Sequence, residues 1–327
     1  VERPTITDAD VHLGRIDPDR FAGGQVPLRP ERSAAAIEAD IGGPLGLSPH
    51  MAAFGITEMV DETMANAARV HAVELGRTAS DYALIAFGGA APLHVGRLAE
   101  KLGIGHVVVP TDAGVGSAIG FLRAPVAYEV VRSRNTRLRN FDAAAINDLF
   151  AEMRAEARAV VKAGAPGSEF QEGRLAYMRY LGQGHEIAVP LPLEPFGADG
   201  GADTLQALFD REYGRLYART LPNAEVEVLT WALTLATADA LPAAASAEAG
   251  PDRPAEAAGE RRIYDPGTGE LRDIPLYWRP DLAPGDRLAG PAVIAEDQTS
   301  TFVPASFDAR IAGNGYILLD RRDEAVS

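Results

Sequence analysis

The stretch that decides the fold runs from Tyr82 to Val109 and reads YALIAFGGAAPLHVGRLAEKLGIGHVVV. An apolar run to Phe87 is followed by a glycine turn, then by apolar residues at helical spacing from Leu93 to Leu102, and then by a second apolar run, Ile104 to Val109. This order predicts a strand, a tight turn, a helix and a strand. Continuous apolar runs are typical of parallel strands covered by helices on both faces, so the stretch predicts an α/β fold.

The glycine turn, Gly88 to Pro92, predicts a ligand site at the start of the helix. Adjacent glycines let the backbone approach a ligand where a side chain would collide, and a helix N-terminus favours negative charge. The alternative interpretation is a tight turn that binds nothing. His94 stands beside the turn and is a candidate for a direct role.

Further helices are expected on either side of this stretch. A long helix is predicted from Ser48 to Leu75, with Gly76 as its end. The small-residue segment Ala113 to Gly120 follows Asp112, which is expected to cap its N-terminus. Its lack of bulk suggests that two helices approach closely there. The segment lacks the glycine spacing of a dinucleotide-binding turn.

Near Arg132 the character of the sequence changes to charged helices and alternating strands. The segment Leu241 to Gly259 is rich in Ala, Pro and Glu and is expected to be a flexible loop inserted between strands. The expected elements are helices at 141–162 and 205–217, two strands that meet at a glycine turn within 173–190, and strands at 226–236, 274–278, 292–294, 299–303 and 316–319.

The composition narrows the class of protein. At 327 residues with 46% hydrophobic and 24% charged side chains, two domains are expected. No apolar run approaches the roughly 20 residues needed to span a bilayer, so no membrane association and a cytoplasmic location are expected. A net charge of -15 argues against nucleic-acid binding. The absence of cysteine excludes disulfides, thiolate metal sites and cysteine nucleophiles.

The six histidines show no metal-ligand spacing, and only His94 and His185 stand where a direct role is plausible, beside the glycine turn and at the predicted hairpin. Asp8, Asp10 and His12 would share one face if their segment were a strand, and could then hold a metal ion. The alternative interpretation of these three residues is a solvated strand edge, and no metal site is assigned.

Several segments together resemble the hydantoinase A/5-oxoprolinase family, and they occur in the family's order along nearly the whole chain. The resemblance is to the C-terminal half of the large A subunit. The matching segments are PTITDADVHLGR (4–15), AFGGAAPLH (86–94), GVGSAIG (114–120), RYLGQ (179–183) and PGDRLAGPAVI (284–294).

The resemblance implies a fold and a division of the chain. Residues 1–132 would form the C-terminal part of an actin-like, ribonuclease H-like ATPase domain that carries the adenosine side of the cleft. Residues 133–327 would form a strand-rich α+β domain of the hydantoinase A type, with the flexible loop at 241–259.

The resemblance also implies an enzyme, an ATP-dependent hydrolase that activates a cyclic amide by phosphorylation. The alternatives are a subunit of an ATP-dependent ketone carboxylase and a non-catalytic assembly subunit. ATP and Mg²⁺ are the implied cofactors, while catalytic residues stay unidentified. The implied nucleotide contacts are Gly88, Gly89, Ala90, Ala91, Pro92, His94, Gly114 and Ser117.

Departures from the family pattern bear on what the chain can do alone. Ala91 stands where the family usually has glycine, and Thr111 to Ala113 replaces a proline-rich run. The family's N-terminal phosphate-binding loops have no counterpart here. The chain is therefore expected to be incomplete, with the Mg²⁺ site finished by residues outside it. The expected partners are the N-terminal half of the A subunit, a B-type subunit and a small-molecule substrate.

Overall fold

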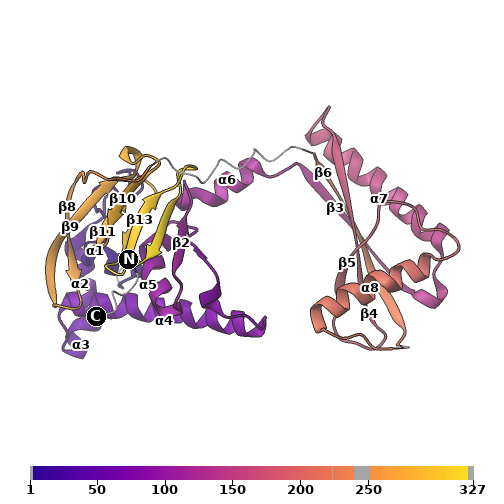
Figure 1. Cartoon of the computed structure of the whole chain (residues 1–327), viewed down its shortest axis with the longest axis horizontal. Coiled ribbons are helices and arrows are strands. Elements are labelled where there is room, and N and C mark those ends of the chain that lie inside the picture. Colours follow the sequence, from indigo (N-terminus) through magenta and orange to yellow (C-terminus); the bar gives the residue numbers. More distant parts are fainter. Residues whose placement is uncertain (1–2, 223, 239–250, 323–327) are drawn as a thin grey trace. The chain divides into compact units, whose positions relative to one another are not determined.

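The computed structural model describes residues 3–222, 224–238 and 251–322, and these residues fall into two compact units (Figure 1). Unit 1 comprises Val1–Leu122 and Ala243–Ser327, and unit 2 comprises Arg123–Pro242. The packing units thus differ from the two expected sequence segments, 1–132 and 133–327. Residues 251–322 pack with the first part of the chain instead of forming one unit with residues 133–238.

A six-stranded sheet explains this grouping. Its order is β1-β2-β14-β13-β10-β7, so β2 from the first part of the chain pairs with β14 from its end. β1 and β2 are parallel, as expected, whereas β14 is antiparallel to β2. The strands are β1 (Leu84–Ile85), β2 (His106–Val109), β14 (Ile317–Arg321), β13 (Phe307–Ile311), β10 (Asp286–Ala289) and β7 (Arg253–Pro254).

A second sheet in unit 1 has four strands in the order β12-β11-β9-β8. Helix α5 (Ala91–Leu102) packs against β12, which brings the C-terminal strands next to the glycine turn. The strands are β12 (Ser300–Val303), β11 (Ala292–Ala295), β9 (Glu270–Trp278) and β8 (Gly259–Asp265).

The helices of unit 1 begin where the sequence supplies caps. Thr5 and Asp8 form a capping box on α1 (Ile6–His12), and the Ser48 side chain caps α4 (Pro49–Glu74). Helix α5 ends at Gly103 in the left-handed conformation, where glycine carries no steric penalty. The remaining helices are α2 (Pro30–Ile37), α3 (Gly43–Leu45) and α6 (Gly116–Arg123).

Unit 2 is an antiparallel sheet with two helices on one face. Burial alternates along β4, so one face of the sheet is covered. The core includes Trp231 edge-on to Phe150 and Tyr180 edge-on to Phe209, which join the sheet to both helices. The elements are β3 (Ala127–Arg137), β6 (Val226–Thr237), β4 (Phe170–Tyr180), β5 (Ile187–Pro190), α7 (Ala143–Gly164) and α8 (Gly201–Tyr217).

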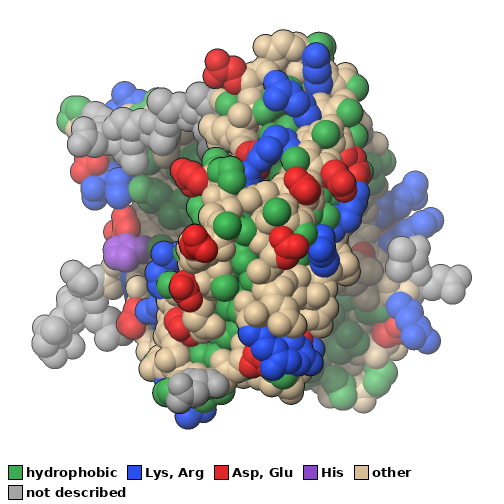
Figure 2. Space-filling model, turned by 90° about the vertical axis from the view of Figure 1, so that its right-hand side faces the viewer, with side chains coloured by type: hydrophobic (Ala, Val, Ile, Leu, Met, Phe, Trp, Pro, Cys, Tyr) green, Lys and Arg blue, Asp and Glu red, His purple; other side chains and the backbone are tan. Residues whose placement is uncertain are grey.

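The surface of unit 2 carries both signs of charge. On the face turned to the viewer in Figure 2, acidic and basic side chains are interspersed with apolar ones, and neither sign forms one continuous field. Among the described residues, no helix combines the length and the apolar character needed to cross a membrane.

The expected strand, turn, helix and strand around Gly88 are present, but the first strand is shorter and more exposed than expected. β1 lies at the edge of its sheet, and 63% of Ile85 and 57% of Phe87 are accessible. The expectation of a strand buried on both faces was therefore wrong for β1, because in the described part of the chain nothing covers this edge.

Asp112 and the small-residue segment after it also differ from expectation. Asp112 makes no side-chain cap hydrogen bond and lies in the left-handed region with φ 56°. The close approaches of the segment are not between helices: a Cβ on Gly114 would lie 2.7 Å from the Gln298 carbonyl oxygen, and one on Gly116 would lie 2.3 Å from the Phe87 ring. The small residues accommodate a turn and an aromatic side chain.

The expected flexible loop, 241–259, is only partly described. Residues 241–250 lie outside the described residues. Within the remainder, Arg253 and Pro254 form β7 and pair with β10, so this portion is part of the sheet. The boundary between the two compact units also falls in this segment, after Pro242.

Two helical glycines in unit 1 should respond oppositely to alanine. A Cβ on Gly96 of α5 would lie 2.5 Å from the Pro304 ring, whereas a Cβ on Gly55 of α4 would meet nothing within 4 Å. We expect Gly96→Ala to lower the free energy of unfolding by about 1 to 3 kcal/mol through overpacking. We expect Gly55→Ala to raise it by up to about 1 kcal/mol through helix propensity. Denaturant unfolding of both variants checks this, and a stable Gly96→Ala protein would contradict the packing of α5 on β12.

Candidate functional site

The turn between β1 and α5 opens on a cavity of about 590 Å³ in unit 1. Its walls come from α1, α4, β1, α5 and the turn between β11 and β12. Most of the wall is apolar, with Val60, Met64 and Leu84 among its residues, and the polar groups are few. Such a cavity suits a small molecule that has an apolar part.

The backbone of the glycine turn is held by hydrogen bonds from two sides. The Gly88 N–H donates to the Ala113 carbonyl oxygen at 2.9 Å, and the Thr299 hydroxyl donates to the Gly89 carbonyl oxygen at 2.6 Å. Gly88 has φ 119°, a conformation that few side chains tolerate. Gly89 lines the cavity and has only ordinary contact, with 3.7 Å from an ideal Cβ to the Gln298 carbonyl oxygen.

Helix α5 directs its N-terminus toward the turn. Ala90 is the N-cap and offers no side-chain acceptor, Pro92 stands in the first turn, and no acidic residue lies there. The first amide groups of the helix and its dipole therefore favour an anion at this end.

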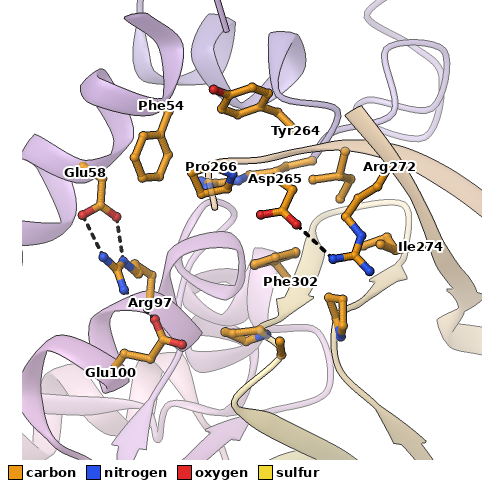
Figure 3. Close-up of a pocket in the computed structure, with 15 residues that line it drawn as sticks. Phe54, Glu58, Arg97, Glu100, Tyr264, Asp265, Pro266, Arg272, Ile274 and Phe302 are labelled. Carbon is orange, nitrogen blue, oxygen red and sulfur yellow. Dashed lines mark hydrogen bonds and ion pairs between the residues drawn. The ribbon is translucent and has the colours of Figure 1, made fainter. Parts of the chain in front are cut away.

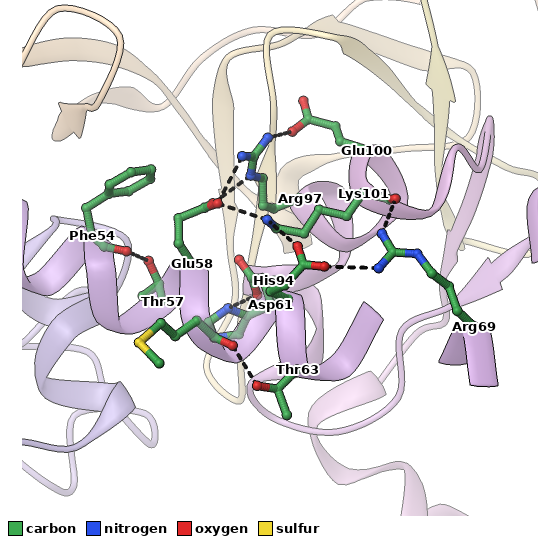
Figure 4. A network of polar contacts seen from close by, with 12 residues as sticks. Phe54, Thr57, Glu58, Asp61, Thr63, Arg69, His94, Arg97, Glu100 and Lys101 are labelled. Carbon is green, nitrogen blue, oxygen red and sulfur yellow. Dashed lines mark hydrogen bonds and ion pairs between the residues drawn. The ribbon is translucent and has the colours of Figure 1, made fainter. Parts of the chain in front are cut away.

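His94 is buried, with 4% of the residue exposed, and it contacts two carboxylates. Its Nδ1 lies 3.0 Å from Asp61 Oδ1, as Figure 4 shows, and its Nε2 lies 3.2 Å from Asp10 Oδ2 in an ion-pair contact without hydrogen-bond alignment. Asp10 and Asp61 are equally buried. The imidazole thus joins α5 to both α1 and α4.

The two carboxylates determine the charge of His94. Burial by itself would lower the pKa of His94, but the contacts with Asp10 and Asp61 outweigh it and raise that pKa to about 9. The ring therefore carries a proton at neutral pH. Because both nitrogens face carboxylates, His94 is suited to hold charge and position, and not to accept a proton as a general base.

A second set of charges fastens α4 to α5 beside His94 (Figure 4). Arg97 donates through Nε and Nη2 to the two oxygens of Glu58, at 2.6 and 3.0 Å, and Lys101 lies 2.9 Å from Glu58 and 3.0 Å from Glu62. The Arg97 hydrogen bond is the main reason that the pKa of Glu58 falls to about 2. Glu58 is therefore ionised throughout the physiological range, and the two helices stay paired.

The structure brings some of the expected site residues together and separates others. Gly89, Ala90, Ala91 and His94 line the one cavity, and Pro92 is buried at the start of α5. Gly88 does not line the cavity, and its N–H donates to the Ala113 carbonyl oxygen. Gly114 packs against Gln298 instead, and Ser117 is exposed on α6. His185 is exposed in the turn between β4 and β5 of unit 2.

The hypothesis of a metal site at Asp8, Asp10 and His12 was wrong because its premise was a strand. The segment is helix α1, which sends the three side chains to different neighbours. Asp8 caps its own helix, Asp10 faces His94, and His12 lies tilted against His50 with ring centroids 4.2 Å apart. Within the described ranges, no group of three or more acidic or histidine side chains is placed to hold a metal ion.

Sequence reasoning missed Asp61, although the sequence contains a signal for it. The buried stripe of α4 includes Ala53, Thr57, Asp61 and Ala65, each four residues after the last. A carboxylate in the middle of a helical stripe of small buried residues must find a partner, because an unpaired buried charge is costly. His94 is that partner.

Two family models match the sequence. One is described as hydantoinase/oxoprolinase and covers residues 1–130, and the other is the hydantoinase/oxoprolinase C-terminal domain and covers residues 134–321. The chain is 29% identical over 327 residues to the acetone carboxylase beta subunit of Xanthobacter autotrophicus, covering 96% of this chain and 45% of that protein. It is 30% identical over 306 residues to caprolactamase subunit alpha of Pseudomonas jessenii, covering 92% and 44%.

Solved structures agree with the sequence matches. An acetone carboxylase in its nucleotide-free form superposes with a TM-score of 0.78 and 28% identity, covering 97% of this chain and 46% of that one. The ATP-dependent caprolactamase of Pseudomonas jessenii gives a TM-score of 0.73 and 26% identity, covering 98% and 47%. The expected α/β fold class is confirmed. The chain spans about half the length of the curated relatives it matches.

Removal of the buried cation should destabilise unit 1 in a pH-dependent way. His94→Gln leaves the buried Asp61 without a counter-charge and Asp10 with Arg15 alone, so we expect the free energy of unfolding to fall by about 3 to 5 kcal/mol at about pH 6. Because the folded pKa of His94, about 9, lies above its ordinary value of 6.5, this stabilisation is complete below 6.5 and is lost as the pH rises through 9.

Denaturant unfolding of both proteins across this pH range measures the difference. His71→Gln is the matched control, because its side chain is 74% exposed on α4. If the free energies of unfolding of the wild type and His94→Gln differ by the same amount from about pH 6 to pH 10, the ring is not protonated in the folded state.

Proposed function

Because this chain belongs to the hydantoinase/oxoprolinase family, we propose that it supplies one wall of the nucleotide site of an ATP-dependent enzyme that opens cyclic amides. The chain spans only 45% of the acetone carboxylase beta subunit and 44% of caprolactamase subunit alpha. The remaining walls of the site, including the cradle for the phosphates, are assigned to the rest of the subunit.

The glycine turn at the N-terminus of α5 supports a nucleotide site most directly. It opens on the cavity of about 590 Å³, whose apolar wall suits an adenine ring, and the helix N-terminus suits a phosphate. Gly89 leaves space for a ligand to reach the backbone. The proposed contacts are Gly88, Gly89, Ala90, Ala91, Pro92 and His94. Gly114 and Ser117 do not line this cavity, and contacts from them would need a part of the nucleotide that extends beyond it.

The proposed reaction activates an amide that water alone attacks slowly. The γ-phosphoryl group moves from ATP to the amide carbonyl oxygen, so the bond to the ADP oxygen breaks and a bond to the carbonyl oxygen forms. Water then adds to the activated carbon, and the ring C–N bond breaks as the nitrogen takes up a proton, which leaves an acyl phosphate. A second water hydrolyses the acyl phosphate to a carboxylate and free phosphate. The residues of this chain would bind and orient the nucleotide, and His94 would keep α5 in place through Asp10 and Asp61.

Mg²⁺ is part of the proposal only through residues outside this chain. Magnesium prefers carboxylate and water oxygens in octahedral geometry. The buried carboxylates next to the cavity, Asp10 and Asp61, already contact His94. Among the described residues, no group of side chains is placed to hold a metal ion. No step of the reaction is therefore assigned to a metal ion held by this chain.

A ketone carboxylase subunit is the second candidate function. The acetone carboxylase beta subunit matches 96% of this chain, and acetone carboxylase gives the higher TM-score of the two structures compared. In that chemistry ATP would activate an oxygen of a different substrate, while this chain would still bind the nucleotide. Both proposed functions need ATP at the glycine turn, so the geometry of that turn does not distinguish a cyclic-amide hydrolase from a ketone carboxylase.

The surface beside β1 supports the proposed partners. β1 is an edge strand, and apolar side chains in it and just after it are accessible, Ile85 to 63% and Phe87 to 57%. Exposed apolar side chains next to an open sheet edge are typical of an interface. We assign this edge to the N-terminal half of the A subunit, and a B-type subunit is the second proposed partner.

A bulky residue at Gly89 should block nucleotide binding without unfolding unit 1. Gly89 does not have a positive φ, and an added Cβ makes only ordinary contact, so Gly89→Leu is expected to fold. Its side chain would enter the cavity, and we expect the affinity for a fluorescent ATP analogue in the complete A subunit to fall at least tenfold, or about 1.4 kcal/mol.

Gly105→Leu is the matched control, because Gly105 also has open space around it but does not line the cavity. Unchanged nucleotide affinity in Gly89→Leu would place the nucleotide elsewhere.

ATP hydrolysis by the complete enzyme distinguishes the two candidate functions. We expect hydantoin, oxoproline or caprolactam to stimulate ADP release, with ring opening seen by mass spectrometry, because each carries a cyclic amide. ADP release that requires acetone or acetophenone together with bicarbonate would instead establish the carboxylase function. If neither the cyclic amides nor the ketones stimulate ADP release, the remaining alternative is a non-catalytic assembly subunit.

A further inference from the structure

A second cavity in unit 1, of about 250 Å³, lies between α4, α5 and the hairpin of β8 and β9 (Figure 3). Phe54, Tyr264 and Phe302 give it an apolar interior. Charged groups line the same wall, and cations and carboxylates occur there in equal number: Arg15, Arg97 and Arg272 face Glu58, Glu100 and Asp265.

The three arginines differ in how many donors they have left. Arg97 donates through Nε, Nη1 and Nη2 to Glu58 and Glu100. Arg15, whose side chain is only 11% exposed, donates through Nη1 to Asp10, and its Nε and Nη2 have no hydrogen-bond partner in the part of the chain that is described. Arg272 donates to Asp265 through Nη1 alone. Arg15 and Arg272 thus keep donors for a carboxylate.

The carboxylates retain capacity to accept. Glu100 accepts one hydrogen bond at each oxygen, from Arg97 and from Ser306, and a carboxylate has about four lone-pair sites. Glu58, Arg97 and Glu100 lie on one side of the cavity in Figure 3, with Asp265 and Arg272 on the opposite side and Phe302 between them. The cavity therefore has polar groups at both ends and an apolar middle.

We propose that this cavity binds a small zwitterion, an amino acid whose carboxylate and ammonium groups are separated by an apolar chain. Arg15 and Arg272 would bind the carboxylate, and Glu100 the ammonium. Because the charges of the wall balance, a ligand without net charge leaves no uncompensated charge in the cavity. Ring opening of a lactam such as caprolactam gives this class of product, so the identification as a product site rests on the proposed function, while binding itself does not.

The site is connected to the glycine-turn cavity through a chain of charges. Arg15 Nη1 lies 3.2 Å from Asp10 Oδ1, and Asp10 Oδ2 lies 3.2 Å from His94 Nε2. Asp10 and His94 line the first cavity, and Arg15 lines the second. A ligand carboxylate on Arg15 would compete with Asp10 for the guanidinium, and the His94 contact would respond.

Binding of ε-aminocaproate to the 327-residue chain tests the site, with caproate and hexylamine as probes that carry one charge each. Calorimetric titration should show the zwitterion binding at least tenfold more tightly than either probe. Arg15→Gln and Arg272→Gln should each lower the affinity for ε-aminocaproate about tenfold, because each removes one charge-assisted hydrogen bond. Arg262→Gln, on β8 with its side chain 71% exposed, should have no effect.

Arg272 is 55% exposed, so Arg272→Gln remains informative if Arg15→Gln fails to fold. Equal affinity for caproate, no zwitterion binding, or binding unaffected by Arg272→Gln would overturn the site. The His94 ring signals in nuclear magnetic resonance should shift on binding, and unchanged signals at saturation would overturn the coupling. ε-Aminocaproate binding by a chain whose complete enzyme opens no lactam would refute the proposed function and leave the binding site intact.

Discussion

The buried contact of His94 with Asp10 and Asp61 is the constraint on which unit 1 depends. The three residues come from α5, α1 and α4, and each is almost fully removed from water. A carboxylate or an imidazolium at such depth is tolerated only with its partner in place. The three helices must therefore assemble together, and the glycine turn, which directly precedes α5, is positioned by the same contact.

This constraint also explains why the charges of unit 1 form a continuous set. Asp10 faces two cations, His94 and Arg15, while Asp61 has His94 as its one cation among the described residues. On the neighbouring surface of α4 and α5, Glu58 is held by Arg97 and Lys101. The net charge of -15 for the whole sequence thus gives no indication of the balanced charges inside this unit, where every carboxylate on the α4–α5 contact has a cation.

Local elements were predictable from the sequence because their signals are local. Ser48 and Gly76 bound α4, and the glycine turn separates β1 from α5, as the periodicity indicates. Pairing over long distances was not predictable: β2 and β14 meet across more than half of the chain, and no short pattern encodes that contact. Alternating acids at Asp8 and Asp10 suggested a strand, but the capping box of Thr5 and Asp8 was the stronger signal, and it starts a helix.

The glycines around the turn separate the requirements of the fold from those of a ligand. Gly88 is needed for its φ of 119°, Gly114 because the Gln298 backbone lies in the way of a Cβ, and Gly116 because the Phe87 ring does. Each of these is explained by contacts within the chain. At Gly89 neither reason applies, since its φ is not positive and its nearest contact is ordinary. The described fold therefore does not require glycine at this position, and the space beside Gly89 agrees with the proposal that a ligand approaches the backbone there.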